Sequence, residues 1–483
     1  MLFRKSCCVV LLVLFWISVP NDSLLARQKE ELLKNTDFVF DGDQLTDWEV
    51  GDGAGGGSVV SKIGPASDGA LELSGNAETQ LWKFVAQEID VAPGDFLKLT
   101  YEARAFDLRR EAGQNDNCYV GFIFANREGG NPGITYYPVT DEDFAGEVRL
   151  VKVPQGAASC KAMVFLSKTG NLQVKNISVQ KATAEESFDL LVQQMDRYYS
   201  YFEHKKVDWN GLVDKYRARA TAAKKRKEFE SVVLEMLAEL NDGHIWIMRG
   251  GQRKQAWSQS KVKRNYDFRA VDRNLKNIQK FGRIGLVART KKGNLGYVRV
   301  TSLAVGLDEM RPMLKAIAGI FDTDGMIVDL RANGGGSEDL GLVLAGAFCK
   351  EPVTYAINRF RKNEKHNEFV ENPRLPLSPI RGDIYDKPVV ALIGAGAVSS
   401  AEGTALMFQA LPNVTLVGQP TRGSTGNPAG VTLPNGTEVW FSRWVACNAD
   451  GEPIEDRGVQ PDIDVEHAKG DPTFKRAVGE LTK

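Results

Sequence analysis

Residues 389–402 read Val-Val-Ala-Leu-Ile-Gly-Ala-Gly-Ala-Val-Ser-Ser-Ala-Glu. The apolar run 389–393 predicts a buried strand, and the small residues after it predict a turn into a helix. A serine at that helix start lies beside backbone N–H groups without intrahelical partners, which can stabilise a developing oxyanion. The stretch therefore fits a nucleophilic serine, with plain helix capping by Ser399 or Ser400 as the alternative.

A second turn follows another apolar run, at 326–330. It reads Asp-Leu-Arg-Ala-Asn-Gly-Gly-Gly over residues 329–336. Three successive glycines let the backbone approach a ligand closely, so Gly334 or Gly335 could offer an N–H group to a carbonyl oxygen. A tight strand-to-helix turn is the alternative. A phosphate-binding loop is disfavoured, because neither GxxxxGK[ST] nor GxGxxG in its usual context is present.

Strands and helices alternate around these two turns, which predicts an α/β core over residues 295–470. We expect strands at 296–301, 326–330, 353–358, 389–393 and 414–417. We expect helices at 307–320, 338–349 and 400–410.

Ahead of the core, residues 183–247 predict a helical cap subdomain. Thr183 and Glu186 have the spacing of a capping box, and apolar residues follow at helical spacing. The second helix ends at Leu-Asn-Asp-Gly-His, residues 240–244, where the histidine is either structural or a candidate base. Residues 248–294 are polar and are assigned to a connecting segment.

The N-terminal part, residues 37–182, predicts an all-β sandwich of the jelly-roll type, because short apolar-rich runs recur between turn signals. Its first and last segments resemble secreted carbohydrate-binding-like jelly rolls. That resemblance implies either a glycan ligand or a packing role. Cys118 and Cys160 lie in this part, either as a disulfide or as buried thiols.

Residues 1–26 predict a signal peptide. Arg4 and Lys5 precede about 13 nearly all apolar residues, a run too short to cross a bilayer comfortably, and Ala26 is a plausible cleavage position. An uncleaved membrane anchor is the alternative. We therefore expect an exported protein, periplasmic or extracellular, with no membrane span once the signal is removed.

Composition excludes several classes of function. The chain has 483 residues, 43% hydrophobic and 25% charged, as in soluble globular proteins of about three domains. The formal charge of −1 gives no basic excess for nucleic acid. With only four histidines a multi-histidine metal centre is hard to assemble, so we expect no metal and no cofactor. His244 is the strongest candidate base, because His204, His366 and His467 lie in charged stretches.

The span 184–467 resembles the tail-specific (C-terminal processing) serine peptidase family, and within it the tricorn-core-like branch. Four motifs occur in the order of that family. They are Leu-x-Asp-Gly-His at 240–244, Asp-x-Arg-x-Asn-x-Gly-Gly at 329–336, Ser-x-x-Glu at 399–402, and Glu-Asp-Arg-Gly-Val-Gln-Pro-Asp at 455–462. The resemblance implies a crotonase/ClpP-like core. The family usually inserts a PDZ module before the core, but the connecting segment is short for one.

The resemblance also implies a set of site residues. Ser399 would be the nucleophile, His244 the base, and Glu455 the acid that orients the base. The oxyanion hole would consist of the Ser400 amide and the amide of Gly334 or Gly335.

Two positions depart from the relatives. Where the Ser-Lys branch of the family carries its lysine, this chain has Ser424, so a Ser-Lys dyad is not available. Where the tricorn branch has a serine before the histidine, this chain has Gly243. Glu455 would then reach His244 directly or through water, or Asp242 would orient the ring instead.

The function that follows is an exported serine endopeptidase acting on a protein or peptide substrate. The alternative is a catalytically weak or inactive protein of the same fold that binds a peptide or a hydrophobic ligand. A GxSxG elbow is absent, which disfavours an esterase of the α/β-hydrolase type.

Overall fold

The computed structural model describes residues 31–483, apart from 53–61, 76–81, 109–117, 168–169, 259–262 and 372–373. The expected signal peptide at 1–26 lies outside the described residues. The chain forms two compact units, and the boundary between them falls after Lys181, with Gly94–Phe96 grouped with the second unit. None of the helices in the described part of the chain is both long and apolar enough to cross a membrane.

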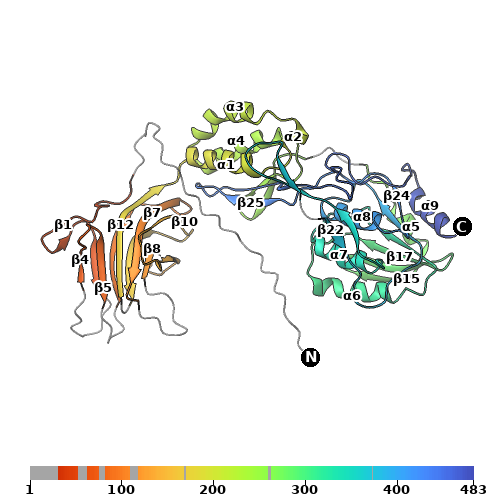
Figure 1. The fold of residues 1–483 in the computed structure, drawn as a ribbon, viewed down its shortest axis with the longest axis horizontal. Coiled ribbons are helices and arrows are strands. Elements are labelled where there is room, and N and C mark those ends of the chain that lie inside the picture. The colour runs from red at the N-terminus through yellow and green to blue at the C-terminus, as the bar shows by residue number, and fades with distance from the viewer. Residues whose placement is uncertain are drawn as a thin grey trace. The chain divides into compact units, whose positions relative to one another are not determined.

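The first unit consists of two antiparallel sheets of five strands each (Figure 1). One has the order β10 (Ala145–Lys152), β7 (Phe96–Phe106), β12 (Gly170–Lys181), β5 (Leu71–Gly75) and β4 (Lys62–Pro65). The other has the order β3 (Glu49–Asp52), β6 (Trp82–Ile89), β11 (Ser159–Ser167), β8 (Cys118–Ala125) and β9 (Gly133–Pro138). A short hairpin of β1 (Phe40–Asp41) and β2 (Gln44–Leu45) precedes them.

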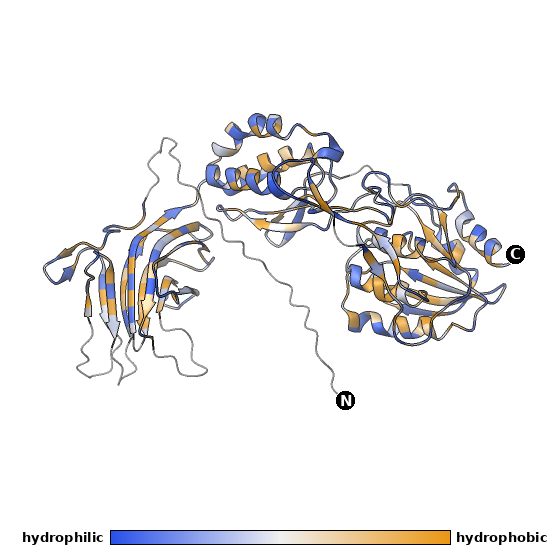
Figure 2. Cartoon of the chain, in the orientation of Figure 1, coloured by the Kyte–Doolittle hydropathy of each residue, from blue (hydrophilic) through white to orange (hydrophobic). Residues whose placement is uncertain are grey.

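Alternating burial explains why these segments form a two-layer structure. In β7 every second side chain is buried, and bands of alternating hydropathy are visible along the strands of this unit in Figure 2. Leu99 and Val174 of one sheet and Phe122 and Val164 of the other belong to a single apolar core. The expected all-β N-terminal region is confirmed. Cys160 is a free, buried thiol, so it forms no disulfide with Cys118.

Four helices open the second unit, as expected of the cap subdomain. They are α1 (Ala184–Tyr198), α2 (Phe202–Lys205), α3 (Trp209–Thr221) and α4 (Arg226–Ala238). Thr183 and Glu186 form the predicted capping box. The helices share an apolar core with a sheet of order β14 (Gln252–Gln255), β13 (Trp246–Arg249), β26 (Glu438–Phe441) and β25 (Ala429–Thr432) (Figure 1). Two segments far apart in sequence therefore build the support for these helices.

The α/β core has a seven-stranded sheet with helices on both faces. The strand order is β15 (Leu275–Phe281), β16 (Gly285–Thr290), β17 (Leu295–Val300), β18 (Gly325–Asp329), β23 (Val389–Ile393), β24 (Val414–Gly418) and β28 (Ile463–Asp464). The strands from β17 to β28 are parallel. One face packs on α6 (Leu307–Ala318), α7 (Glu338–Gly346) and α8 (Ser400–Gln409), and the other on α5 (Phe268–Asp272) and α9 (Pro472–Leu481).

The boundaries of the core differ from the expectation in two places. Residues 275–290, expected in the connecting segment, form β15 and β16 of the core sheet. β15 is an edge strand whose side chains are mostly exposed, so its sequence lacks the apolar period of a strand. The strand expected at 353–358 is β19 (Val353–Ala356), which pairs outside the core sheet with β22 (Leu375–Leu377). A further small sheet contains β20 (Arg359–Arg361), β21 (Phe369–Glu371) and β27 (Trp444–Val445).

A buried ion network holds the glycine turn after β18. The Arg331 guanidinium donates to both carboxylate oxygens of Asp329, at 2.9 and 2.7 Å, and to Asp471 at 2.8 Å. All three side chains are fully buried. A Cβ atom on Gly396 would lie 2.2 Å from the Arg331 carbonyl oxygen, so the turn after β23 packs directly on this one. The two turns singled out in the sequence are therefore neighbours.

Candidate active site

A cavity of about 740 Å³ lies where these turns meet residues that follow α4 and β24. His244, Gly335, Ser399, Ser400 and Ser424 all line it. They come from four separate segments of the chain, so the fold brings together the predicted nucleophile, base and glycine turn. The site can be built up from each of them in turn.

Ser399 precedes α8 in a strained backbone conformation. Its φ is 61° and its ψ is −129°, which is uncommon for a residue other than glycine and typical of functional turns. Gly335 lies directly against it, because a Cβ atom there would be 3.1 Å from Ser399 Cβ and 2.7 Å from the Val398 carbonyl oxygen. Gly335 also has a φ of +85°. Both space and backbone conformation therefore require glycine at this position.

Glu402, on the first turn of α8, ties the nucleophile to the loop that follows β24. Its fully buried carboxylate accepts hydrogen bonds from the backbone N–H groups of Ser399 (3.2 Å), Gly423 (2.7 Å) and Ser424 (3.0 Å). It also accepts one from the Thr421 hydroxyl at 2.7 Å. Burial raises the pKa of Glu402 to about 7, against the lowering effect of these donors.

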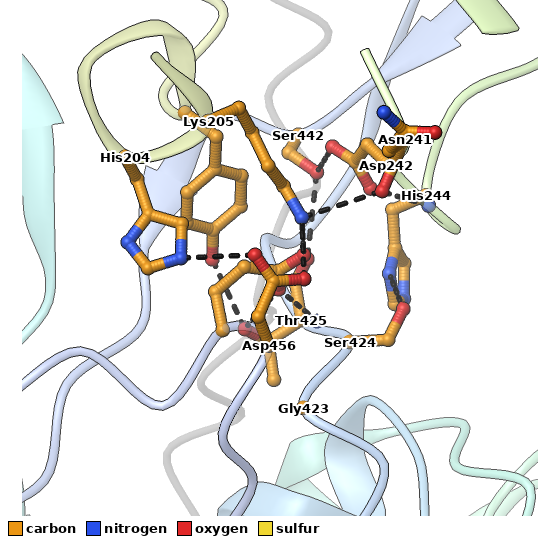
Figure 3. Close-up of polar contacts among 12 residues, drawn as sticks. His204, Lys205, Asn241, Asp242, His244, Gly423, Ser424, Thr425, Ser442 and Asp456 are labelled. Carbon is orange, nitrogen blue, oxygen red and sulfur yellow. Dashed lines mark hydrogen bonds and ion pairs between the residues drawn. The ribbon is translucent and has the colours of Figure 1, made fainter. Parts of the chain in front are cut away.

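His244 is buried and oriented from two sides (Figure 3). Its Nδ1 lies 3.1 Å from Ser424 Oγ, and its backbone N–H donates to Asp242 Oδ1 at 2.6 Å. Asp242 Oδ2 in turn accepts from the Ser442 hydroxyl at 2.8 Å. Burial lowers the pKa of His244, and Arg253 lowers it further, although Asp242 acts in the opposite direction. The ring is therefore neutral at neutral pH and can accept a proton.

Ser424 is a candidate site residue whose contact with His244 was not predicted from the sequence, where it stands out only as the replacement of a lysine. A Cβ atom on Gly243 would lie 2.7 Å from Ser424 Oγ, so the hydroxyl occupies the space that a side chain at position 243 would need. Two departures from the family pattern, taken together, could have indicated this contact. They are a glycine before the histidine and a serine at the lysine position.

Glu455 is buried and contacts Thr425 and Lys205, two residues that Figure 3 labels. Its Oε2 accepts from the Thr425 N–H at 2.9 Å, and its Oε1 pairs with Lys205 Nζ at 3.1 Å. Burial raises the pKa of Glu455 well above its usual range, Asp242 adds to this, and Lys205 opposes it. Within the described part of the chain, no hydrogen bond joins Glu455 to the His244 ring. Lys205, which was not foreseen from the sequence, also pairs with Asp456 at 2.6 Å.

The three expected oxyanion donors differ in their hydrogen-bond acceptors. The Gly335 N–H donates to Asn333 Oδ1 at 2.9 Å, and the Gly334 N–H donates to the Thr301 carbonyl oxygen at 3.3 Å. Ser400 is the first residue of α8, where a backbone N–H has no intrahelical acceptor. Its hydroxyl donates to the Gly336 carbonyl oxygen at 2.6 Å, which links the two turns.

Comparison with known proteins identifies two regions of the chain. Residues 294–465 match the model of peptidase family S41, and residues 180–238 match that of the tricorn protease C1 domain. The carboxy-terminal processing protease CtpA of Bacillus subtilis (strain 168) is 24% identical over 182 residues, which is 36% of this chain and 36% of that protein. The chain thus spans about a third of the length of this curated relative.

Solved structures resemble the second unit. A crystal structure of a candidate peptidase from Parabacteroides merdae ATCC 43184 is 26% identical, with a TM-score of 0.55, and covers 62% of this chain and 98% of its own. The photosystem II D1 C-terminal processing protease is 14% identical, with a TM-score of 0.40, and covers 62% and 96%. The first of these supports a mixed α/β peptidase fold for the C-terminal part.

The raised pKa of Glu402 predicts how the free energy of unfolding depends on pH. In the unfolded chain this carboxyl has its usual pKa near 4.5, whereas in the folded chain it is about 7. The folded state therefore holds the proton more tightly, so stability is fully present below about pH 4.5 and is lost as the pH rises through 7. Relative to Glu402→Gln, the wild-type free energy of unfolding should fall by about 3 kcal/mol over this interval.

Denaturant unfolding of the wild type and of Glu402→Gln between pH 4 and pH 8 measures this difference. Subtracting the two free energies of unfolding removes the contribution of the other titratable groups, which both proteins share. If the wild type instead gains stability relative to Glu402→Gln as the pH rises, the prediction is wrong. The four hydrogen-bond donors would then lower the pKa of Glu402 by more than burial raises it.

Proposed function

Because the chain carries a peptidase family S41 domain with a tricorn C1 domain ahead of it, we propose that it is an exported serine endopeptidase. Its substrate is a protein or peptide bound in the cavity around Ser399. The main support for this proposal is that Ser424 contacts both Ser399 and His244. Its carbonyl oxygen accepts from the Ser399 N–H at 3.1 Å, and its hydroxyl lies 3.1 Å from His244 Nδ1.

In the proposed reaction, Ser399 Oγ attacks the carbonyl carbon of the scissile peptide bond. Its proton passes to Nε2 of His244, because Nδ1 is engaged by Ser424. The tetrahedral intermediate collapses, the C–N bond breaks, and His244 returns the proton to the leaving amine. A water molecule then attacks the acyl-enzyme in the same way, which releases the acid product and restores the serine.

Asp242 favours the charged form of the imidazolium that forms in this reaction. Glu455 is held in place by Thr425 and Lys205. In this proposal Glu455 is a positioning residue. It fixes the 424–425 backbone that carries the Ser424 hydroxyl, and it need not touch the ring.

The oxyanion is stabilised by the amides of Ser400 and Gly335. For the Gly335 N–H to reach the substrate, the substrate oxygen must replace Asn333 Oδ1 as its acceptor. The exchange leaves the buried Asn333 Oδ1 without this donor, which costs about 1–3 kcal/mol. The Gly334 amide, which donates to Thr301, is the reserve donor of the same turn.

A second function, glycan binding, is proposed for the jelly-roll-like N-terminal unit. Tyr119, Tyr136 and Phe165 lie on the sheet face that points away from the apolar core. Their ring centroids are 5.6 to 6.2 Å apart, and the rings of Tyr136 and Phe165 are stacked at 10°. Such partly exposed aromatic rings suit the apolar faces of sugar rings, with the tyrosine hydroxyls as polar partners.

The peptidase assignment is tested on the protein that begins at residue 27. Ser399→Ala and His244→Ala should each lower cleavage of an unfolded protein substrate by at least about 10⁴-fold, since each removes a group that acts in the chemical step. A serine-directed phosphonate should label Ser399. His467→Ala, which changes an exposed histidine, is the control and should retain full activity. Undiminished cleavage by either active-site variant would refute the assignment, and a wild type without cleavage or adduct would favour a binding protein.

Ser424→Ala should lower kcat/KM by about 10- to 100-fold, because the His244 ring loses the partner of its Nδ1. The loss should fall on kcat and leave KM nearly unchanged. Ser424→Thr keeps the hydroxyl and should recover part of the activity. Ser258→Ala, at another serine lining the cavity, should behave like the wild type. Equal kcat values for Ser424→Ala and the wild type would remove Ser424 from the mechanism.

Glycan binding is tested with the Ser399→Ala protein on a glycan array. Tyr136→Ala and Phe165→Ala should each weaken binding to the retained glycans by at least about 10-fold, since each removes a stacking surface. Ile134→Ala removes an exposed apolar side chain from the same strand as Tyr136 and should have no effect. An array that retains no glycan leaves the unit with a packing role only.

A further inference from the structure

A carboxylate without a cationic partner lies in the active-site cavity. Glu338 is the first residue of α7, two positions beyond the glycine turn, and it lines the cavity together with Tyr355. Its Oε1 accepts a hydrogen bond from the Tyr355 hydroxyl at 2.8 Å. Among the described residues, no lysine, arginine or histidine pairs with it. Its position at the start of a helix does not by itself explain why the Glu338 side chain lines the cavity.

The Glu338 carboxylate lies one helical turn from the nucleophile. Gly403 follows Ser399 by four residues on α8, which is about 6 Å along the helix axis. A Cβ atom on Gly403 would lie 3.1 Å from Glu338 Oε1. The absence of a side chain at Gly403 therefore lets the Glu338 carboxylate pack closely against α8.

Part of the cavity lining is aliphatic. Ala356, Leu406, Ala446 and Ile454 line the cavity, and all four are buried. A side chain with a long apolar stem and a cationic head matches this lining, since the stem packs on the aliphatic wall and the head meets the carboxylate. An apolar side chain would leave the half-buried carboxylate without a counter-ion, and an acidic one would be repelled.

We propose that Glu338 selects substrates with lysine or arginine at the residue that contributes the scissile carbonyl. This inference rests on the proposed peptidase function. The leaving amine must lie near His244, which protonates it, so the α7–α8 side of Ser399 receives the residue on the acyl side. Burial raises the pKa of Glu338, as it does for a carboxylate without a counter-ion, and a bound ammonium or guanidinium supplies that counter-ion.

The test uses the protein beginning at residue 27 and peptides that differ only at the residue before the cleaved bond, which is lysine, arginine, leucine or glutamate. The wild type should prefer lysine and arginine over leucine by at least about 10-fold in kcat/KM. Glu338→Gln should reduce this ratio by about 10- to 100-fold, mostly through slower cleavage of the basic peptides. Glutamine still accepts from Tyr355, so the fold should be retained, and the thermal midpoint checks this.

Asp339→Asn is the matched control, because it removes the same charge from the adjacent, exposed position and should leave the ratio unchanged. A lysine-to-leucine ratio that is the same in the wild type and in Glu338→Gln overturns the inference, as does a wild-type preference for leucine or glutamate. Binding of the same peptides to Ser399→Ala, with and without Glu338→Gln, gives a readout independent of turnover. If the wild type cleaves no peptide, the peptidase function fails and this binding ratio alone decides the inference.

Discussion

The buried Glu402 carboxylate is the constraint on which the site depends. Its two oxygens hold the Ser399 amide and the amides of Gly423 and Ser424, so it joins the start of α8 to the loop after β24. The same loop carries the hydroxyl that contacts His244. Ser399 and His244, the proposed nucleophile and base, are thus held in relation to each other by one desolvated acid, which is satisfied by four donors.

A second buried charge network does the same for the oxyanion turn. Arg331, Asp329 and Asp471 are all fully buried, and their bidentate pairing fixes the backbone just before the three glycines. Such networks are strongly destabilised when one partner is removed, because a buried charge then remains unpaired. The buried polar residues of the two turns therefore serve the geometry of the backbone.

The sequence predicted those features around the candidate site that depend on a local pattern. Local signals predicted the two turns of small residues after apolar strands and the helix that ends near His244, whereas the family resemblance supplied the roles expected of Ser399, Gly335 and His244. The α/β alternation and the β-rich N-terminal region followed from the same signals. The contact of Ser424 with His244 joins residues 180 positions apart, and no local pattern encodes such a contact. The polar edge strand β15 was missed because its side chains are solvated on nearly all sides.

The contact between Gly243 and Ser424 couples two positions that lie far apart in the sequence. A Cβ atom at position 243 would lie 2.7 Å from Ser424 Oγ, so any side chain there must displace the hydroxyl that contacts His244. A side chain at position 243 and the present contact of Ser424 with His244 therefore exclude each other, and the two departures from the family pattern are consistent with each other in space.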